Sequence, residues 1–107
     1  MTNRENRVDA KAIIGAELTP ARDGATLGRH IIEAGLVLDD LIIDVTDLAP
    51  EDIVSTFVNA FLHELELGGR DIAGAGGIHW KAKFPSEADR LGELVSYYVQ
   101  DSTAKQA

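Results

Sequence analysis

A short apolar strand pattern followed by a long amphipathic helix pattern constrains the fold of this chain more than any other feature. Residues 41–45 (LIIDV) are apolar and β-branched, which is typical of a strand buried on both faces of a sheet. Residues 50–67 begin with Pro50, which suits a first helical turn, and end before the glycines 68–69. The apolar stripe of this second segment has helical spacing and consists of Val54, Phe57, Val58, Phe61, Leu62 and Leu65. We therefore expect a strand, a connector and a helix in the middle of the chain.

Strand and helix patterns alternate on both sides of this central unit. Residues 11–18 alternate as in a strand, and residues 25–35 show helical spacing that ends at a glycine. Residues 78–84 alternate like an edge strand protected by lysines, and residues 85–100 carry the apolar stripe of a last helix. The order strand, helix, strand, helix, strand, helix predicts an α/β fold with a mostly parallel sheet and helices packed on it.

Length and composition indicate one domain. The chain has 107 residues, of which 45% are hydrophobic, and this is enough apolar surface for one core. We expect a disordered arm at 1–10, the folded domain at 11–100 and a disordered tail at 101–107. Three strands make a small sheet, which leaves room for a homodimer contact. The absence of cysteine and of any long apolar run predicts a cytoplasmic protein that does not enter membranes.

Negative charge is concentrated in the middle of the chain. The segment from His30 to Gly69 holds nine acidic residues and no Lys or Arg, and the net charge of the whole chain is −8. Such a surface repels phosphate backbones, so nucleic acid is not an expected partner. It suits a basic protein surface or divalent cations, although acidic residues also keep many small domains soluble.

Patterns that carry catalysis, cofactors or metals are missing from the sequence. His30, His63 and His79 are scattered without paired spacing, so we expect no metal site. Ser55 and His63 would lie about 12 Å apart along one helix, whereas a nucleophile and its base need roughly 3 Å. The glycine-rich stretch 68–77 lacks the lysine and hydroxyl of a phosphate-binding loop. We therefore expect no catalytic residue, no cofactor and no enzymatic activity.

Two adjacent hydroxyls, Ser55 and Thr56, lie in the early turns of the expected central helix. A phosphate near a helix N-terminus gains from free N–H groups and from the helix dipole, so both are candidate phosphorylation sites. Glu51 and Asp52 would repel such a phosphate. Either hydroxyl can instead donate to a backbone carbonyl three or four residues earlier, which would be a purely structural role.

The same region resembles a known family. The segment DLIIDVTDLAPEDIVSTFVNAFLHEL is similar to the STAS-like bacterial domains of unknown function. Their segment is a strand ending in Asp, a connector, and a helix that opens with a small hydroxyl residue and Phe, matched here by Asp44, Ser55 or Thr56, and Phe57. Asn59 stands where an acid or amide is common, and Arg22 and Gly24 match an upstream Arg-x-Gly. The resemblance covers residues 21–67.

This resemblance implies a small α/β sandwich related to the anti-sigma-factor antagonists. Those STAS domains dock on a kinase-like ATPase and are switched by phosphorylation at a helix N-terminus, where this chain has Asp52 followed by Ile53 in place of the serine. We therefore expect a non-enzymatic, STAS-like regulatory domain that binds a kinase-like ATPase or another regulator. The acidic helix entrance is the expected docking surface, with Asp47, Glu51, Asp52, Ser55 and Asn59 as its candidate residues. The alternative is a module that binds a small molecule or a nucleotide-like anion at the strand-to-helix switch point.

Overall fold

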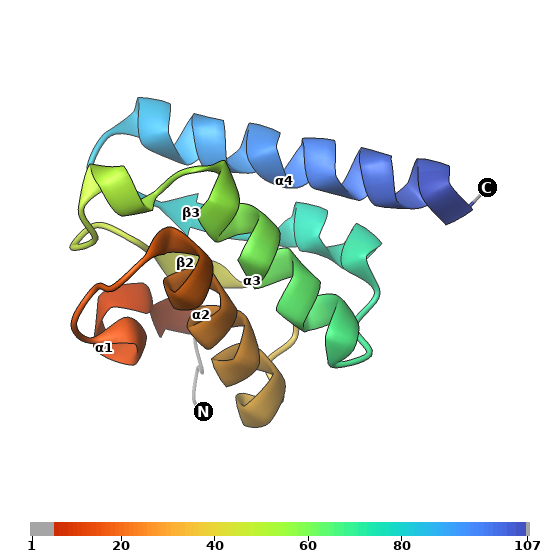
Figure 1. Ribbon diagram of the computed structural model, residues 1–107, viewed down its shortest axis with the longest axis horizontal. Coiled ribbons are helices and arrows are strands. Elements are labelled where there is room, and N and C mark those ends of the chain that lie inside the picture. The colour runs from red at the N-terminus through yellow and green to blue at the C-terminus, as the bar shows by residue number, and fades with distance from the viewer. Residues whose placement is uncertain (1–5, 107) are drawn as a thin grey trace.

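The computed structural model describes residues 6–106, in which a three-stranded sheet packs against four α-helices (Figure 1). The strands are β1 (Arg7–Asp9), β2 (Ile42–Asp44) and β3 (His79–Lys81), and they pair in parallel in the order β1-β2-β3. The helices are α1 (Ala10–Ile14), α2 (Pro20–Ala34), α3 (Ser55–Leu67) and α4 (Pro85–Gln106), with short 3₁₀ turns η1 (Pro50–Asp52) and η2 (Ile72–Gly77) between them. The predicted α/β class and parallel pairing are confirmed.

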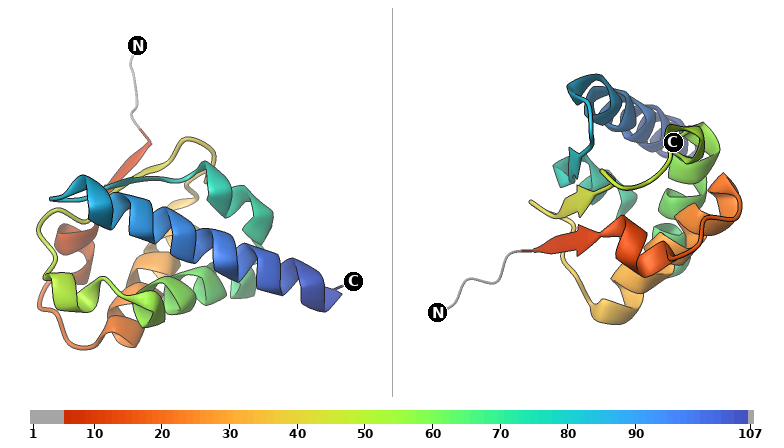
Figure 2. Two further views of the ribbon diagram at one scale, coloured as in Figure 1. Left: turned by 90° about the horizontal axis from the view of Figure 1, so that it is seen from above. Right: turned by 90° about the vertical axis from the view of Figure 1, so that its left-hand side faces the viewer.

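The helices cover only one face of the sheet. Val8, Ile43 and Trp80 stand side by side in register and point toward the helices, which lie on one side of the strands in the right-hand view of Figure 2. The other face carries charged residues, among them the exposed Arg7 and Lys81. The prediction that residues 41–45 form a strand buried on both faces is therefore wrong, because β2 has a polar neighbour on each side at its open face.

Helices α2 and α3 lie in close contact through two glycines. A Cβ atom at Gly24 would overlap the backbone carbonyl of Phe57, and one at Gly28 would lie 2.7 Å from the carbonyl oxygen of Phe61. These glycines let the two backbones approach, so that Phe57 and Phe61 are fully buried in the core. Gly28 is thus a packing position within α2.

The N-terminal third of the chain differs most from its prediction. The expected strand at 11–18 is wrong, because Ala10–Ile14 form a helix whose start is capped by the Asp9 side chain and whose end is Gly15 at φ 73°. The first strand instead lies at Arg7–Asp9, inside the segment predicted to be a disordered arm. Residues 1–5 of that arm fall outside the described part of the chain.

Helix boundaries also shift. Thr19 caps α2 and Pro20 begins it, so this helix starts five residues before the predicted position at 25, while Gly35 ends it in the left-handed conformation as expected. The predicted helix over 50–67 is divided, because the backbone leaves helical geometry after η1, where Ile53 turns into the core. Helix α4 continues to Gln106 through the segment predicted to be a disordered tail. None of the described helices combines the length and hydrophobicity needed to cross a lipid bilayer.

Candidate functional site

The candidate docking residues lie on the connector after β2, on η1 and on the first turns of α3. Asp47, Glu51, Ser55 and Asn59 are exposed, and we call these four residues the acidic entrance surface. Asp47 and Glu51 form no ion pair with any of the described residues. Their carboxylates are therefore open to a partner.

Asp52 does not belong to this surface. Its side chain is buried, with only 6% exposed, so the prediction of a docking role for it is wrong. The reason is that η1 turns Asp52 inward, toward the loop before α2 and the first turn of α2 itself. No periodicity in the sequence marks this inward turn, because it depends on residues about thirty positions earlier.

Asp52 faces two other carboxylates, and we call Glu17, Asp23 and Asp52 the carboxylate cluster, in which Asp23 and Asp52 are buried and Glu17 is partly exposed. Asp23 accepts hydrogen bonds from the backbone N–H of Leu18, the shorter at 3.2 Å. Glu17 accepts from the backbone N–H of Ala49 at 2.8 Å and pairs with the Lys11 ammonium at 3.2 Å. The cluster therefore ties the connector after β2 to α1 and to the start of α2.

Protonation completes the cluster. The Asp52 Oδ2 atom is buried and has no hydrogen-bond partner among the described residues. Burial, followed by the hydrogen bond and charge of Asp23 and by the charge of Glu17, raises the pKa of Asp52 to about 7, while Lys11 opposes the shift. A proton held between Asp52 and Asp23 removes one of two adjacent negative charges. The hydrogen bond from Ala49, the largest influence on Glu17, holds the pKa of Glu17 below its ordinary value.

The hydroxyls of Ser55 and Thr56 lie at the first two positions of α3, and both side chains are exposed. Val54 precedes them and supplies no side-chain cap to the helix. Neither hydroxyl donates to an earlier carbonyl within residues 6–106, unlike Thr26, whose hydroxyl bonds to the Arg22 carbonyl at 2.9 Å. The structural role considered for these hydroxyls is thus not observed.

The polar side of α3 runs from the acidic entrance surface to a contact with α4. Asn59 and His63 line a shallow hollow beside Tyr98. At the far end, Glu66 accepts hydrogen bonds from the Tyr98 hydroxyl at 2.6 Å and from Ser102 at 2.9 Å. Burial and then the Glu66 carboxylate raise the pKa of Tyr98 to about 12. The freely accessible part of this side is therefore its N-terminal end.

The open face of the sheet carries a second set of charged groups, which the sequence analysis missed. The Arg7 guanidinium pairs with Asp44 at 2.7 Å, and His79 lies 3.2 Å from the Asp40 carboxylate. Partial burial of Asp44 is outweighed by hydrogen bonds from Thr46 and Arg7, so the pKa of Asp44 is held below its ordinary value. The pairing of β1 with β2 brings Arg7 to Asp44, because Arg7 and Asp44 lie on neighbouring strands.

Metal-ligating groups do not converge in the part of the chain that the structure describes: no set of three or more His, Asp or Glu side chains is arranged to hold a metal ion. Within the carboxylate cluster, Asp23 and Glu17 accept backbone hydrogen bonds from Leu18 and Ala49, and Glu17 also pairs with Lys11. The arrangement of the cluster fits a structural tie rather than a ligand site.

Comparison with known proteins identifies no relative. The chain matches no protein-family model, and no curated protein or solved structure is significantly similar to it. The resemblance to STAS-like domains therefore rests on segment 21–67 alone. Within it, Gly24 and Phe57 meet at the contact between α2 and α3, and Asp44 pairs with Arg7, so these positions also have packing roles.

Proposed function

We propose that this chain is a non-enzymatic, STAS-like regulatory domain that docks a protein partner with a basic surface through the acidic entrance surface. The observation that carries the proposal is the exposure of Asp47 and Glu51 without any cation among the described residues to pair with. They belong to a forty-residue span with no Lys or Arg, so an approaching basic surface meets no opposing charge from neighbouring positions in the sequence.

Phosphorylation of Ser55 or Thr56 would regulate this docking. Both hydroxyls are exposed at the helix N-terminus, where backbone N–H groups and the dipole stabilise a phosphate. Asp52 is buried and its pKa is raised to about 7, so near neutral pH it repels a phosphate less than the exposed Glu51 does. Ile53 is buried, so it occupies the expected switch position as a core residue.

The test begins with crosslinking and mass spectrometry of the full chain in its native cells, to identify the partner and any phosphate on Ser55 or Thr56. A kinase-like ATPase or another regulator is the expected partner. Calorimetry with that partner should then show that combining Asp47→Lys with Glu51→Lys weakens binding by about tenfold, because two complementary charges are reversed. Glu33→Lys is the matched control, since Glu33 is an exposed acid on α2. Unchanged affinity in the double variant would move the docking surface elsewhere.

The alternative function, binding of a small molecule or anion beside the central connector, has weaker support. A hollow of about 540 Å³ lies between η1 and the start of α4, and Arg90 is its only cation among the described lining residues. Glu87 and Glu93 line the same hollow, so carboxylates outnumber the cation. A thermal shift with ATP or inorganic phosphate that is lost in Arg90→Gln would favour this alternative over protein docking.

A further inference from the structure

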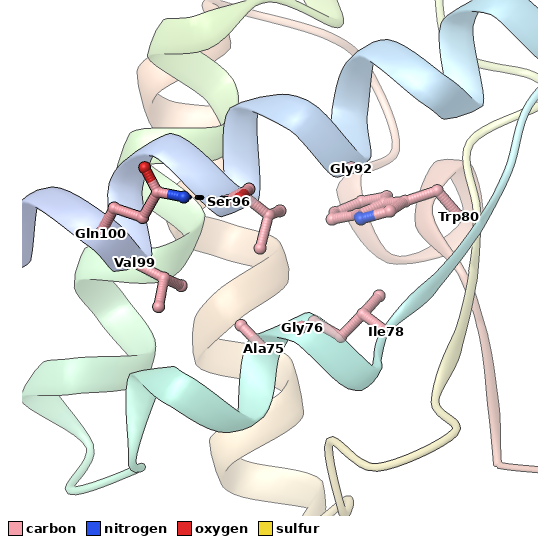
Figure 3. Close-up of a pocket in the computed structure, with 9 residues that line it drawn as sticks. Ala75, Gly76, Ile78, Trp80, Gly92, Ser96, Val99 and Gln100 are labelled. Atoms are coloured by element: carbon pink, nitrogen blue, oxygen red, sulfur yellow. Dashed lines mark hydrogen bonds between the residues drawn. The ribbon is translucent and has the colours of Figure 1, made fainter. Parts of the chain in front are cut away.

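An apolar groove separates helix α4 from the turn η2 and the strand β3. The groove has a volume of about 420 Å³, and side chains from both walls point into it in Figure 3. Its apolar lining includes Ala75 and Ile78 on one wall, Val95 and Val99 on the other, and Trp80 at one end. This volume and lining are typical of a binding groove in a protein of this size.

The helical wall of the groove is low at Gly92. A Cβ atom added at Gly92 would meet no atom within 4 Å, so this glycine leaves open space where most residues would place a side chain. A second hollow shares Ile78, Trp80 and Gly92 with the first and continues along α4 as far as Ala88. The combined shape fits an extended chain better than a compact ligand.

The strand beside the groove has a free edge. β3 is the last strand of the sheet. The His79 N–H donates to the Leu41 carbonyl and the Val45 N–H donates to the Lys81 carbonyl, both at 2.7 Å. Successive residues of a parallel strand bond in opposite directions, so the N–H and C=O of Trp80 point away from β2. None of the described residues outside the sheet hydrogen-bonds to these two groups. They are an open template for another strand.

The charges around the groove differ between its two sides. Asp89 and Glu93 stand four residues apart on α4 at the groove, and neither forms an ion pair with a described residue. Lys81 is exposed on the open face of the sheet, on the opposite side of β3 from Trp80. Side chains of an added strand alternate between these two sides. Basic side chains therefore suit the α4 side, and acidic side chains suit the side of Lys81.

We propose that the groove between β3 and α4 binds an extended segment of a partner protein, which adds to the sheet as a fourth strand beside Trp80. Its groove-facing residues are apolar or basic, and the residues between them are acidic or small and polar. Backbone hydrogen bonds along the edge supply affinity, and the groove and its acidic rim supply specificity. This surface shares no residue with the acidic entrance surface, so either docking mode can hold without the other.

The test uses a fluorescein-labelled heptapeptide library. Four alternating positions carry Val, Ile, Leu, Phe, Lys or Arg, and the three positions between them carry Glu or Thr. Fluorescence polarisation with the full chain should select peptides that combine an apolar and a basic residue on one side. Amide hydrogen exchange followed by NMR should then show the Trp80 N–H protected by about tenfold or more when a selected peptide is bound, because strand addition gives it an acceptor.

Two variants and one control separate the groove from the rest of α4. Gly92→Leu places a side chain in the open space, where its Cβ atom meets no atom within 4 Å, and should weaken peptide binding by about tenfold or more. The double change Asp89→Lys with Glu93→Lys should weaken binding of Lys- or Arg-containing peptides by a similar factor and decides the matter if Gly92→Leu fails to fold. Tyr97→Leu changes an exposed residue on the α3 side of α4, and it should leave peptide binding unchanged.

Three results would overturn the proposal. The first is the absence of any selected peptide at concentrations near the millimolar range, where weak strand addition is still detected. The second is peptide binding without protection of the Trp80 amide, which would show that strand addition does not occur. The third is protection of that amide in the protein alone together with a dimer mass, which would assign the edge to a second copy of the chain.

Discussion

Two regions of the helical layer, around α2 and around α4, are packed in opposite ways. On the α2 side, Gly24 and Gly28 bring two helices into backbone contact, and the space between them is full. On the α4 side, Gly92 faces open space and helix α4 stands off from β3 and η2. Glycine thus closes a contact in one region and leaves a groove in the other.

This difference in packing separates a rigid region of the fold from a region that can accept a partner. The region around α2 also holds the carboxylate cluster, in which Asp23 and Glu17 accept hydrogen bonds from backbone N–H groups and Glu17 pairs with Lys11. The region around α4 has fewer ties to the rest of the molecule, among which the hydrogen bonds from Tyr98 and Ser102 to Glu66 stand out. The effects of substitutions on the free energy of unfolding should therefore differ between the two regions in size and even in sign.

Gly24→Ala should have the largest effect. The added methyl group would overlap the Phe57 carbonyl, and backbone cannot move aside as a flexible side chain can. We expect a loss of about 3 kcal/mol in the free energy of unfolding, the upper end of the usual cost of overpacking. Urea unfolding followed by circular dichroism measures it. A variant as stable as the parent would show that α2 and α3 are farther apart than described.

The pH dependence of stability should come next. The pKa of Asp52 is about 7 in the folded chain and about 3.9 in an unfolded one, so between these values the folded state holds a proton that the unfolded state lacks. Stability is therefore highest near and below pH 4 for this group, and it falls as the pH rises toward 7. In the parent, we expect the free energy of unfolding to fall by on the order of 2 kcal/mol between pH 5 and 8 because of this group. Asp52→Asn should remove that fall.

Urea unfolding at several pH values makes this comparison. Glu51→Gln is the matched control, because Glu51 is an exposed acid one residue away. It should leave the pH dependence of the parent unchanged. Parallel curves for the parent and Asp52→Asn would contradict the role of the cluster.

Tyr98→Phe should cost less. It removes the hydroxyl that donates to Glu66 at 2.6 Å, and a hydrogen bond of this kind contributes about 1 kcal/mol to the free energy of unfolding. Tyr97→Phe is the control, since Tyr97 is 66% exposed on the same helix. Thermal unfolding of both variants should show a lower melting temperature for Tyr98→Phe and an unchanged one for Tyr97→Phe. Equal melting temperatures would show that the Tyr98 hydroxyl does not help to hold α4.

Gly92→Ala should have the smallest effect, and the opposite sign to Gly24→Ala. The added methyl group meets no atom within 4 Å, and alanine is favoured over glycine inside a helix by about 0.5–1 kcal/mol. A small rise in the free energy of unfolding is expected from urea unfolding. A loss of stability would mean that α4 packs more closely on β3 than the groove indicates.

Local patterns in the sequence identified several elements correctly. The strand at Ile42–Asp44, the buried stripe of α3 and the end of α2 at Gly35 all follow from residues that are neighbours in the sequence. The apolar residues Phe57, Phe61 and Leu65 are fully buried, as their helical spacing predicts. Of the candidate residues at the acidic helix entrance, all are exposed except Asp52, which is buried.

The rest depended on contacts between distant parts of the chain. Arg7–Asp9 form a strand because β2 pairs with them across thirty-five residues, and nothing in that short polar segment marks it as a strand. Asp52 is buried beside Asp23 and Glu17, which lie in the connection between β1 and β2. The groove exists because Gly92 of α4 lies opposite Ile78 and Trp80. The sequence by itself determined the periodic elements, whereas the tertiary structure decided which polar groups are buried and which edges stay open, since both depend on long-range packing.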